Sequence, residues 1–203
     1  ILYRMNAQSN TIENALIRSG IAYKIIGGLR FYERKEIKDI IAYLSVINNN
    51  SDAIRLKRII NEPKRGIGDA TVDKAQEIAD MLGVPLFEIL ERAEEFQPLA
   101  KKCKPLMEFA QMLNELGQIA ENGSLEELFD ELLERTGYLI HLRAMGDEGI
   151  NRIENVNELK TNIIKYVEEM EKLPQPSIDP DHPDEEPEIM MPSLEGFLEE
   201  VTL

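Results

Sequence analysis

Apolar residues recur with a helical period along most of this chain. From residue 33 onward they follow one another at steps of three or four positions, until residues 48–51 (NNNS) interrupt the stripe. Such a stripe is typical of a helix that buries one face. The first stripe consists of Ile37, Ile40, Ile41, Leu44 and Ile47. The same reasoning predicts helices over residues 52–61, 71–82, 85–95, 98–121, 125–135 and 151–172, and a last short helix from Ser193.

The opening residues follow a different pattern. Residues 1–5 (ILYRM) and 21–26 (IAYKII) are short, apolar and compatible with strands, and a helix is expected between them over residues 11–18. Two short strands cannot close a sheet by themselves. The predicted fold is therefore mainly α: a multi-helix domain preceded by a small, truncated α/β piece.

Residues 173–192 differ from everything before them, because six prolines lie there among acidic residues. Proline removes a backbone donor and fixes φ, and the segment has little apolar content to offset its ordering entropy. We expect an acidic, proline-rich loop. A solvated linker and a regulatory or partner-binding tail are both compatible with it.

Composition limits the compartment and the chemistry. Cys103 is the only cysteine, which excludes an internal disulfide, and His141 and His182 are isolated, so spacing gives no metal cluster. No apolar run approaches the ~20 residues of a membrane span, and no signal pattern opens the chain. We expect a cytoplasmic protein with no membrane partner, and the start at Ile1 suggests a fragment of something longer.

The net charge of −15 argues at first sight against a nucleic-acid partner, but the charge is unevenly distributed. Residues 179–200 contain nine acids and no Lys or Arg, whereas residues 55–65 carry a local charge of +4. Recognition depends on the field within about a Debye length, ~10 Å at moderate salt. An acidic chain can therefore still make a basic contact at residues 55–65.

The stretch at 61–71, NEPKRGIGDAT, lies between two predicted helices. Gly66 and Gly68 permit positive φ and leave backbone N–H groups uncovered, and the next helix adds free N–H groups and the positive end of its dipole. Such a concavity can bind a phosphate oxygen without reading a base. The expected point charge, forked donor and apolar plug are Lys64, Arg65 and Ile67. An ordinary helix–turn–helix connection is the alternative, and the residues alone leave both open.

Motifs for catalysis are missing from the sequence. It contains no G-x-x-x-x-G-K-[ST] phosphate loop, no G-x-G-x-x-G, no G-x-S-x-G elbow and no H-E-x-x-H. This chain by itself is therefore expected to carry out no reaction.

Three blocks together resemble the UvrD/PcrA/Rep group of superfamily 1 DNA helicases, over essentially the whole chain. They are LYRMNAQSNTIENAL at 2–16, YKIIGGLRFYERKEIKDIIAYLSVI at 23–47 and the INEPKRGIG-x-x-T motif at 60–71. Their order and spacing agree with that family. Asn10 stands where the family usually has Arg, which leaves the role of that Arg in doubt here.

The resemblance implies that residues 1–50 belong to the RecA-like subdomain 2A. Residues 51–203 would form the helical subdomain 2B, with a helix–hairpin–helix-like GIG turn. The parent would be an ATP-dependent 3′–5′ DNA helicase in repair or replication that uses ATP and Mg. Its nucleotide motifs would lie outside this chain, so the fragment itself would hold no cofactor.

The resemblance also assigns DNA contacts by motif. The residues that would hold the duplex backbone are Lys64, Arg65, Gly66, Ile67, Gly68 and Thr71. The residues in the block linked to the DNA track of 2A are Gly27, Gly28, Phe31, Arg34 and Lys38. For Phe31 a place in the core is an equally open interpretation.

Two functions follow from these expectations. In the first, the fragment anchors duplex DNA without sequence preference and regulates unwinding, while motor domains elsewhere pull single-stranded DNA. In the second, it is a protein-interaction or autoinhibitory module that docks repair or transcription partners. The acidic loop favours the second function and the basic stretch favours the first.

Overall fold

The computed structural model describes residues 12, 13, 15, 16, 18–22, 30–173 and 191–202. The expected strand at 1–5 and most of the one at 21–26 lie outside these residues, as do Asn10, Gly27 and Gly28. The described residues between 12 and 18 are helical, as expected, and no strand occurs among the residues that the structure describes.

The described chain is a stack of helices. Its α-helices are α2 (Lys35–Asn48), α3 (Ala53–Ile59), α4 (Asp69–Leu82), α5 (Leu86–Glu91), α6 (Cys103–Asn122), α7 (Leu125–Thr136), α8 (Tyr138–Arg143), α9 (Asp147–Glu171) and α10 (Leu194–Thr202). Short 3₁₀ turns are η1 (Phe31–Glu33), η2 (Ala93–Glu95) and η3 (Gln97–Leu99). The mainly α fold class is therefore confirmed.

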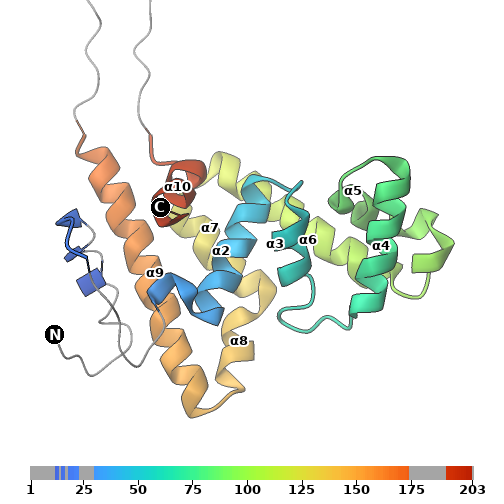
Figure 1. Ribbon diagram of the computed structural model, residues 1–203, viewed down its shortest axis with the longest axis horizontal. Helices are drawn as coiled ribbons and strands as arrows, with labels where there is room; N and C mark the ends of the chain where they lie inside the picture. Colours follow the sequence, from blue (N-terminus) through green and yellow to red (C-terminus); the bar gives the residue numbers. More distant parts are fainter. Residues whose placement is uncertain (1–11, 14, 17, 23–29, 174–190, 203) are drawn as a thin grey trace, which may run out of the picture.

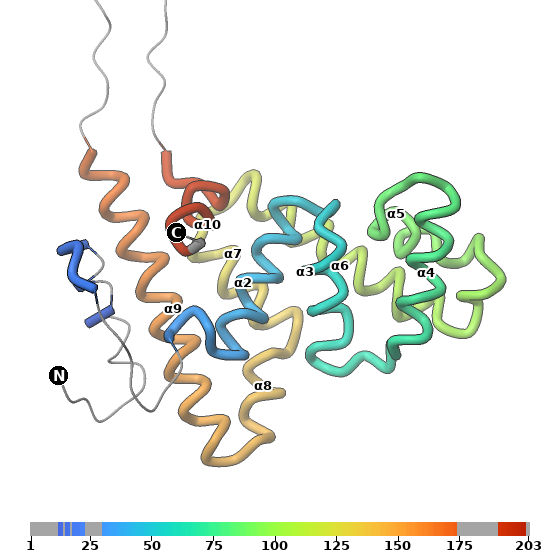
Figure 2. Tube along the Cα trace, viewed as in Figure 1, coloured from blue at the N-terminus to red at the C-terminus, as the bar shows by residue number. Residues whose placement is uncertain are grey.

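Helix α2 is central to this stack. It packs against α3, α6, α9 and α10, and its apolar stripe lies in one core with residues from all of them. The long α9 runs along one side of the molecule, and α4 and α5 form the opposite end (Figure 1). The connection from α3 to α4 passes below these two helices in this view (Figure 2).

Helix α6 begins later than its stripe predicts. The expected helix at 98–121 is divided into η3 and α6, which starts at Cys103. Pro105 is the reason, because proline is tolerated in the first turn of a helix but not in its interior. A helix starting at residue 98 would place Pro105 in the interior, whereas the observed start places it in the first turn. The expected helix at 85–95 is also divided into two elements, α5 and η2.

Helix α8 was not predicted. It has six residues and lies between Gly137 and Gly146, both with positive φ. A segment of this length is shorter than the windows in which a helical period can be recognised. It turns directly into α9, where a Cβ added at Gly149 would collide with the Leu142 carbonyl. Glycine at this position therefore permits the close approach of α8 to α9.

Candidate nucleic-acid interface

Asn61 holds the connection between α3 and α4 in shape. Its Oδ1 accepts hydrogen bonds from the backbone N–H groups of Arg65, at 2.8 Å, and Ile67, at 3.3 Å. Gly66 has a φ of 71°, a left-handed conformation that glycine adopts without steric cost. Asn61 and Gly66 together fix a tight turn ahead of α4. The Glu62–Pro63 peptide bond in this turn is cis.

Ile67 anchors the turn from the inside. Its side chain is 0% exposed and lies in the core with Ile59, Ile60 and Val72. Ile67 is thus buried, as an apolar plug requires. On either side of it, the backbone at residues 66 and 68 is exposed.

Arg65 points inward rather than toward solvent. Its Nη1 donates to the carbonyl oxygens of Ile59 at 3.2 Å and Pro63 at 3.1 Å. Its Nη2 donates to the hydroxyl of Tyr43 at 2.8 Å. The guanidinium also lies over the ring of Phe109, 4.9 Å from its centroid. The forked donor that the sequence suggested for a phosphate thus has protein acceptors here and clamps the turn onto the core.

Tyr43 extends this clamp. Burial raises the pKa of its hydroxyl to about 12, although the Arg65 charge acts in the opposite direction. The hydroxyl is therefore neutral at physiological pH, so it can accept from Arg65 and donate to the carbonyl of Glu62 at 2.7 Å. The carbonyl groups of the turn are consequently satisfied on the inner side.

Backbone donors remain on the outer side of the turn. Among the residues that the structure describes, none accepts a hydrogen bond from the N–H groups of Gly66, Gly68, Asp69 or Ala70. Gly68 is the N-cap of α4 with φ −90°, so it does not use the positive φ that glycine allows. Thr71 differs from these four, because its N–H is bonded to the carbonyl of Gly68 at 2.8 Å. The N–H groups of these four residues and the positive end of α4 are therefore available to an anion.

Two lysines flank these donors. Lys64 is exposed, as expected for a point charge at the turn. Lys102, the N-cap of α6, was not predicted, yet its Nζ lies 3.6 Å from the position of a Cβ built on Gly66. The run KKCK at 101–104 was the available signal, but the sequence alone does not show that it folds back onto the turn.

The residues predicted for the DNA track of subdomain 2A are divided between the interior and the surface. Phe31 is 1% exposed and Arg34 7% exposed, and Arg34 donates to Asn155 on α9 at 2.8 Å. The packing supports the core interpretation of Phe31 and gives Arg34 a structural bond. Lys38 is exposed and lies at a hollow between α2, α3 and α10 that Arg55 also lines.

The buried carboxylate of Asp39 on α2 is the centre of a charge cluster that no motif suggested. The Asp39 carboxylate is 2.7 Å from Nη2 of Arg58 on α3 and 2.9 Å from Nζ of Lys35. It also accepts a hydrogen bond from the hydroxyl of Tyr138 on α8 at 2.8 Å. Burial and this carboxylate raise the pKa of Tyr138, so its hydroxyl stays protonated. Asp39 thus links three helices.

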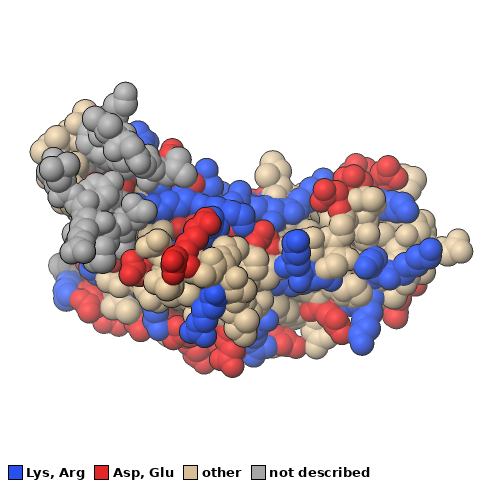
Figure 3. Space-filling model, turned by 90° about the horizontal axis from the view of Figure 1, so that it is seen from below, with Lys and Arg blue, Asp and Glu red and all other residues tan. Residues whose placement is uncertain are grey.

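Cationic side chains gather on the face that carries the α3–α4 turn. Viewed from below relative to Figure 1, Lys and Arg form a band across the middle of this face and recur toward one end (Figure 3). Acidic side chains lie beside this band and along the edges of the face in this view. The acidic chain therefore presents a surface with the charge that a phosphate backbone requires.

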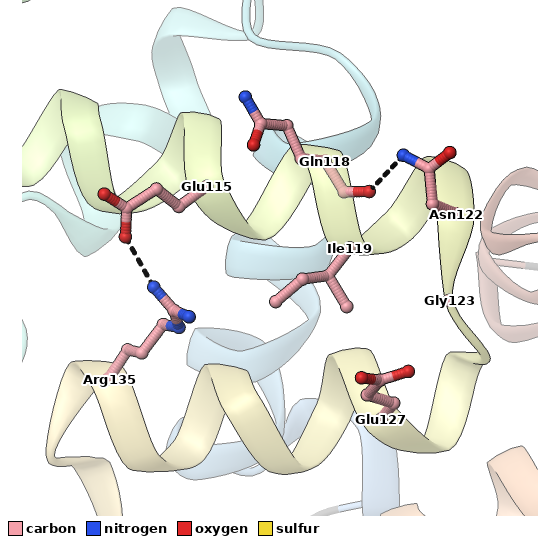
Figure 4. A pocket seen from close by; sticks show the side chains of 7 residues that line it. All are labelled: Glu115, Gln118, Ile119, Asn122, Gly123, Glu127 and Arg135. Atoms are coloured by element: carbon pink, nitrogen blue, oxygen red, sulfur yellow. Dashed lines mark hydrogen bonds and ion pairs between the residues drawn. The ribbon is translucent and has the colours of Figure 1, made fainter.

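A hollow between α6 and α7 offers no comparable site. Arg135 reaches across it to Glu115 and is also bonded to Glu131, so its charge is neutralised (Figure 4). None of the predicted site residues lines it. Elsewhere among the described residues, no group of three or more His, Cys, Asp or Glu could hold a metal ion. No described helix is long and apolar enough to cross a membrane.

Comparison with known proteins gives a consistent result. Residues 1–203 match the family model of the UvrD-like helicase C-terminal domain. The ATP-dependent DNA helicase PcrA of Bacillus subtilis is 40% identical over 159 residues, which are 78% of this chain and 22% of the relative. UvrD1 of Mycobacterium tuberculosis is 43% identical over 164 residues, 78% of this chain and 21% of the relative. PcrA of Staphylococcus aureus is 38% identical over 180 residues, 88% of this chain and 24% of the relative.

The chain spans about a fifth to a quarter of the length of these curated relatives. The family model, in contrast, covers the chain from its first residue to its last. The chain therefore belongs to the UvrD-like helicase C-terminal domain family.

Proposed function

We propose that this chain is part of an ATP-dependent 3′–5′ DNA helicase and that its α3–α4 turn grips the phosphate backbone of duplex DNA. One observation carries the proposal: the N–H groups of Gly66, Gly68, Asp69 and Ala70 have no acceptor among the described residues, on a turn whose carbonyl groups are held from inside. Donors without acceptors beside the exposed Lys64 suit an anionic ligand.

Backbone donors also suit the work of a helicase. Contacts to phosphate position a protein on DNA but carry no sequence information. A turn that offers N–H groups and a lysine holds any duplex equally well, which a translocating enzyme requires. In this proposal the grip anchors the duplex while motor segments pull one strand.

The same proposal assigns the chain to two subdomains and places the cofactor sites outside it. Residues 1–50 would belong to subdomain 2A and residues 51–203 to 2B, with α2 joining them through the shared core. ATP and Mg would be bound by the whole protein through segments other than these, because this chain contains no phosphate-loop motif. Its own task would be binding and regulation.

Replacing Lys64 by Ala tests the grip. We expect duplex affinity to fall about threefold for every sequence tried. The slope of log K against log salt should become shallower by about one, which corresponds to one lost phosphate contact. The measurement is fluorescence anisotropy of labelled duplexes at 50 to 200 mM salt. Lys165→Ala is the matched control, because Lys165 is exposed on α9 and has no ion pair among the described residues.

The wild-type chain should bind with the non-specific affinity typical of such contacts, about 10⁻⁴–10⁻⁶ M. A Lys64→Ala chain with the affinity and salt slope of the Lys165→Ala control would refute the grip. Affinity that depended strongly on duplex sequence would refute its backbone character.

A protein-docking or autoinhibitory role is the second candidate. Its support is the acidic, proline-rich sequence at 173–192, most of which lies outside the described residues. Failure of the wild-type chain to bind duplex, together with capture of a repair or transcription protein that depends on residues 173–192, would favour this role.

A further inference from the structure

The segment that leads into α6 approaches the same turn from the other side. η3 packs against α4, with Leu99 buried at its end, and the chain then passes Lys101 and Lys102 before α6 begins. Because Pro105 prevents an earlier start of α6, these two lysines lie on the short connection instead of inside a helix.

Lys102 reaches the outer surface of the turn. Its Nζ lies 3.6 Å from the position of a Cβ built on Gly66. A second contact fixes this arrangement: Arg65, the next residue back, lies over Phe109 in the second turn of α6. The turn and the start of α6 are therefore held together, with Lys102 outside and Arg65 inside.

The charge of Lys102 is not neutralised within the described chain. Neither Lys101 nor Lys102 has a carboxylate within 4.0 Å among the described residues, whereas Lys104 pairs with Glu108 at 3.7 Å. Lys102 is half-buried, whereas Lys101 and Lys64 are exposed cations. Lysine charges that have no carboxylate partner attract an anion such as a phosphate group. This arrangement thus favours binding of a phosphate.

We propose that Lys102, supported by Lys101, supplies the second half of the phosphate site, so that duplex DNA is held between the α3–α4 turn and the segment that precedes α6. This inference rests on the proposed function and adds a residue to it. The cation that faces the phosphate opposite Lys64 is Lys102, while Arg65, which the sequence suggested, holds the turn. The ligand is a phosphate group of the DNA backbone, and no base is read.

The test compares three single variants, Lys102→Ala, Lys101→Ala and Lys104→Ala, in the 203-residue chain. We expect Lys102→Ala to weaken duplex binding about threefold and to lower the salt slope by about one contact. Lys101→Ala should give a smaller loss. Lys104→Ala should bind duplex with the wild-type affinity, because the Lys104 side chain is 82% exposed and already has Glu108 as its partner. Circular dichroism checks that each variant is folded, as substitution of surface lysines should leave it.

The double variant Lys64→Ala/Lys102→Ala sharpens the result. If both lysines contact phosphate, the slope should fall by about two contacts. Lys102→Arg should retain most of the affinity, since it keeps the charge. A Lys102→Ala chain that binds like Lys104→Ala, while Lys64→Ala binds weakly, would overturn this inference and leave the proposed function intact. Absence of duplex binding by the wild-type chain would instead overturn the proposed function itself.

Discussion

Replacing Asp39 by Ala is expected to lower the free energy of unfolding by about 2 kcal/mol, because a buried hydroxyl and two half-exposed cations lose their shared acceptor. The carboxylate is 1% exposed and is surrounded by Arg58, Lys35 and the hydroxyl of Tyr138. Without it, the hydroxyl of the buried Tyr138 has no acceptor, which costs about 1–3 kcal/mol by itself. The two cations can turn toward water, so the loss stays below the upper limit for a fully buried pair.

Guanidinium-induced unfolding followed by circular dichroism measures this effect. Asp39→Asn is the informative second variant, since its amide oxygen can still accept from Tyr138 and its loss should be smaller. Asp130→Ala is the matched control, because Asp130 pairs with Lys160 at 2.7 Å on the surface, where such pairs contribute about 0–1 kcal/mol. Equal losses for Asp39→Ala and Asp130→Ala would show that the buried cluster does not hold the three helices together.

Asp39 also shows where reasoning from sequence stops. The apolar stripe around it predicted α2 correctly, since Ile37, Ile40 and Leu44 repeat at helical spacing and are buried. A periodicity argument places a charged residue in that stripe on the solvent side. The partner that makes its burial tolerable, Tyr138, lies 99 residues away on a helix that no pattern indicated. Only the packing of α8 against α2 brings the two together.

Some features of the turn between α3 and α4 could likewise be predicted from the sequence, and others could not. Local chemistry predicted its position, the burial of Ile67 and the need for glycine at residue 66, because each depends on a few neighbouring residues. The direction of Arg65 could not be predicted, since a guanidinium next to two glycines fits a phosphate as well as it fits two carbonyls. Tyr43 and Phe109 decide between them, and both belong to other helices.

Replacing Arg65 by Ala should therefore have two effects of different origin. Two carbonyl groups and the Tyr43 hydroxyl lose a charged partner, which should lower the free energy of unfolding by about 2 kcal/mol. The turn also loses its inner clamp, so the N–H groups at 66–70 and Lys64 no longer share one geometry. We expect duplex affinity to fall about tenfold or more, beyond the effect of losing any single phosphate contact.

Arg65→Lys separates a clamp from a phosphate contact. Lysine keeps the charge but cannot make the forked contacts of a guanidinium. If Arg65 held phosphate directly, Arg65→Lys would bind duplex nearly as well as the wild type and keep its salt slope. If Arg65 is a clamp, Arg65→Lys should bind almost as weakly as Arg65→Ala.

Tyr43→Phe completes the argument, because Tyr43 is 0% exposed and cannot touch DNA. Its loss removes only the hydroxyl that joins Arg65 to the Glu62 carbonyl. We expect Tyr43→Phe to weaken duplex binding with an unchanged salt slope, since no cation leaves the surface. Anisotropy titrations at several salt concentrations, made well below the unfolding temperature, measure both quantities. Wild-type affinity in Tyr43→Phe and in Arg65→Lys would exclude the clamp and return Arg65 to the phosphate.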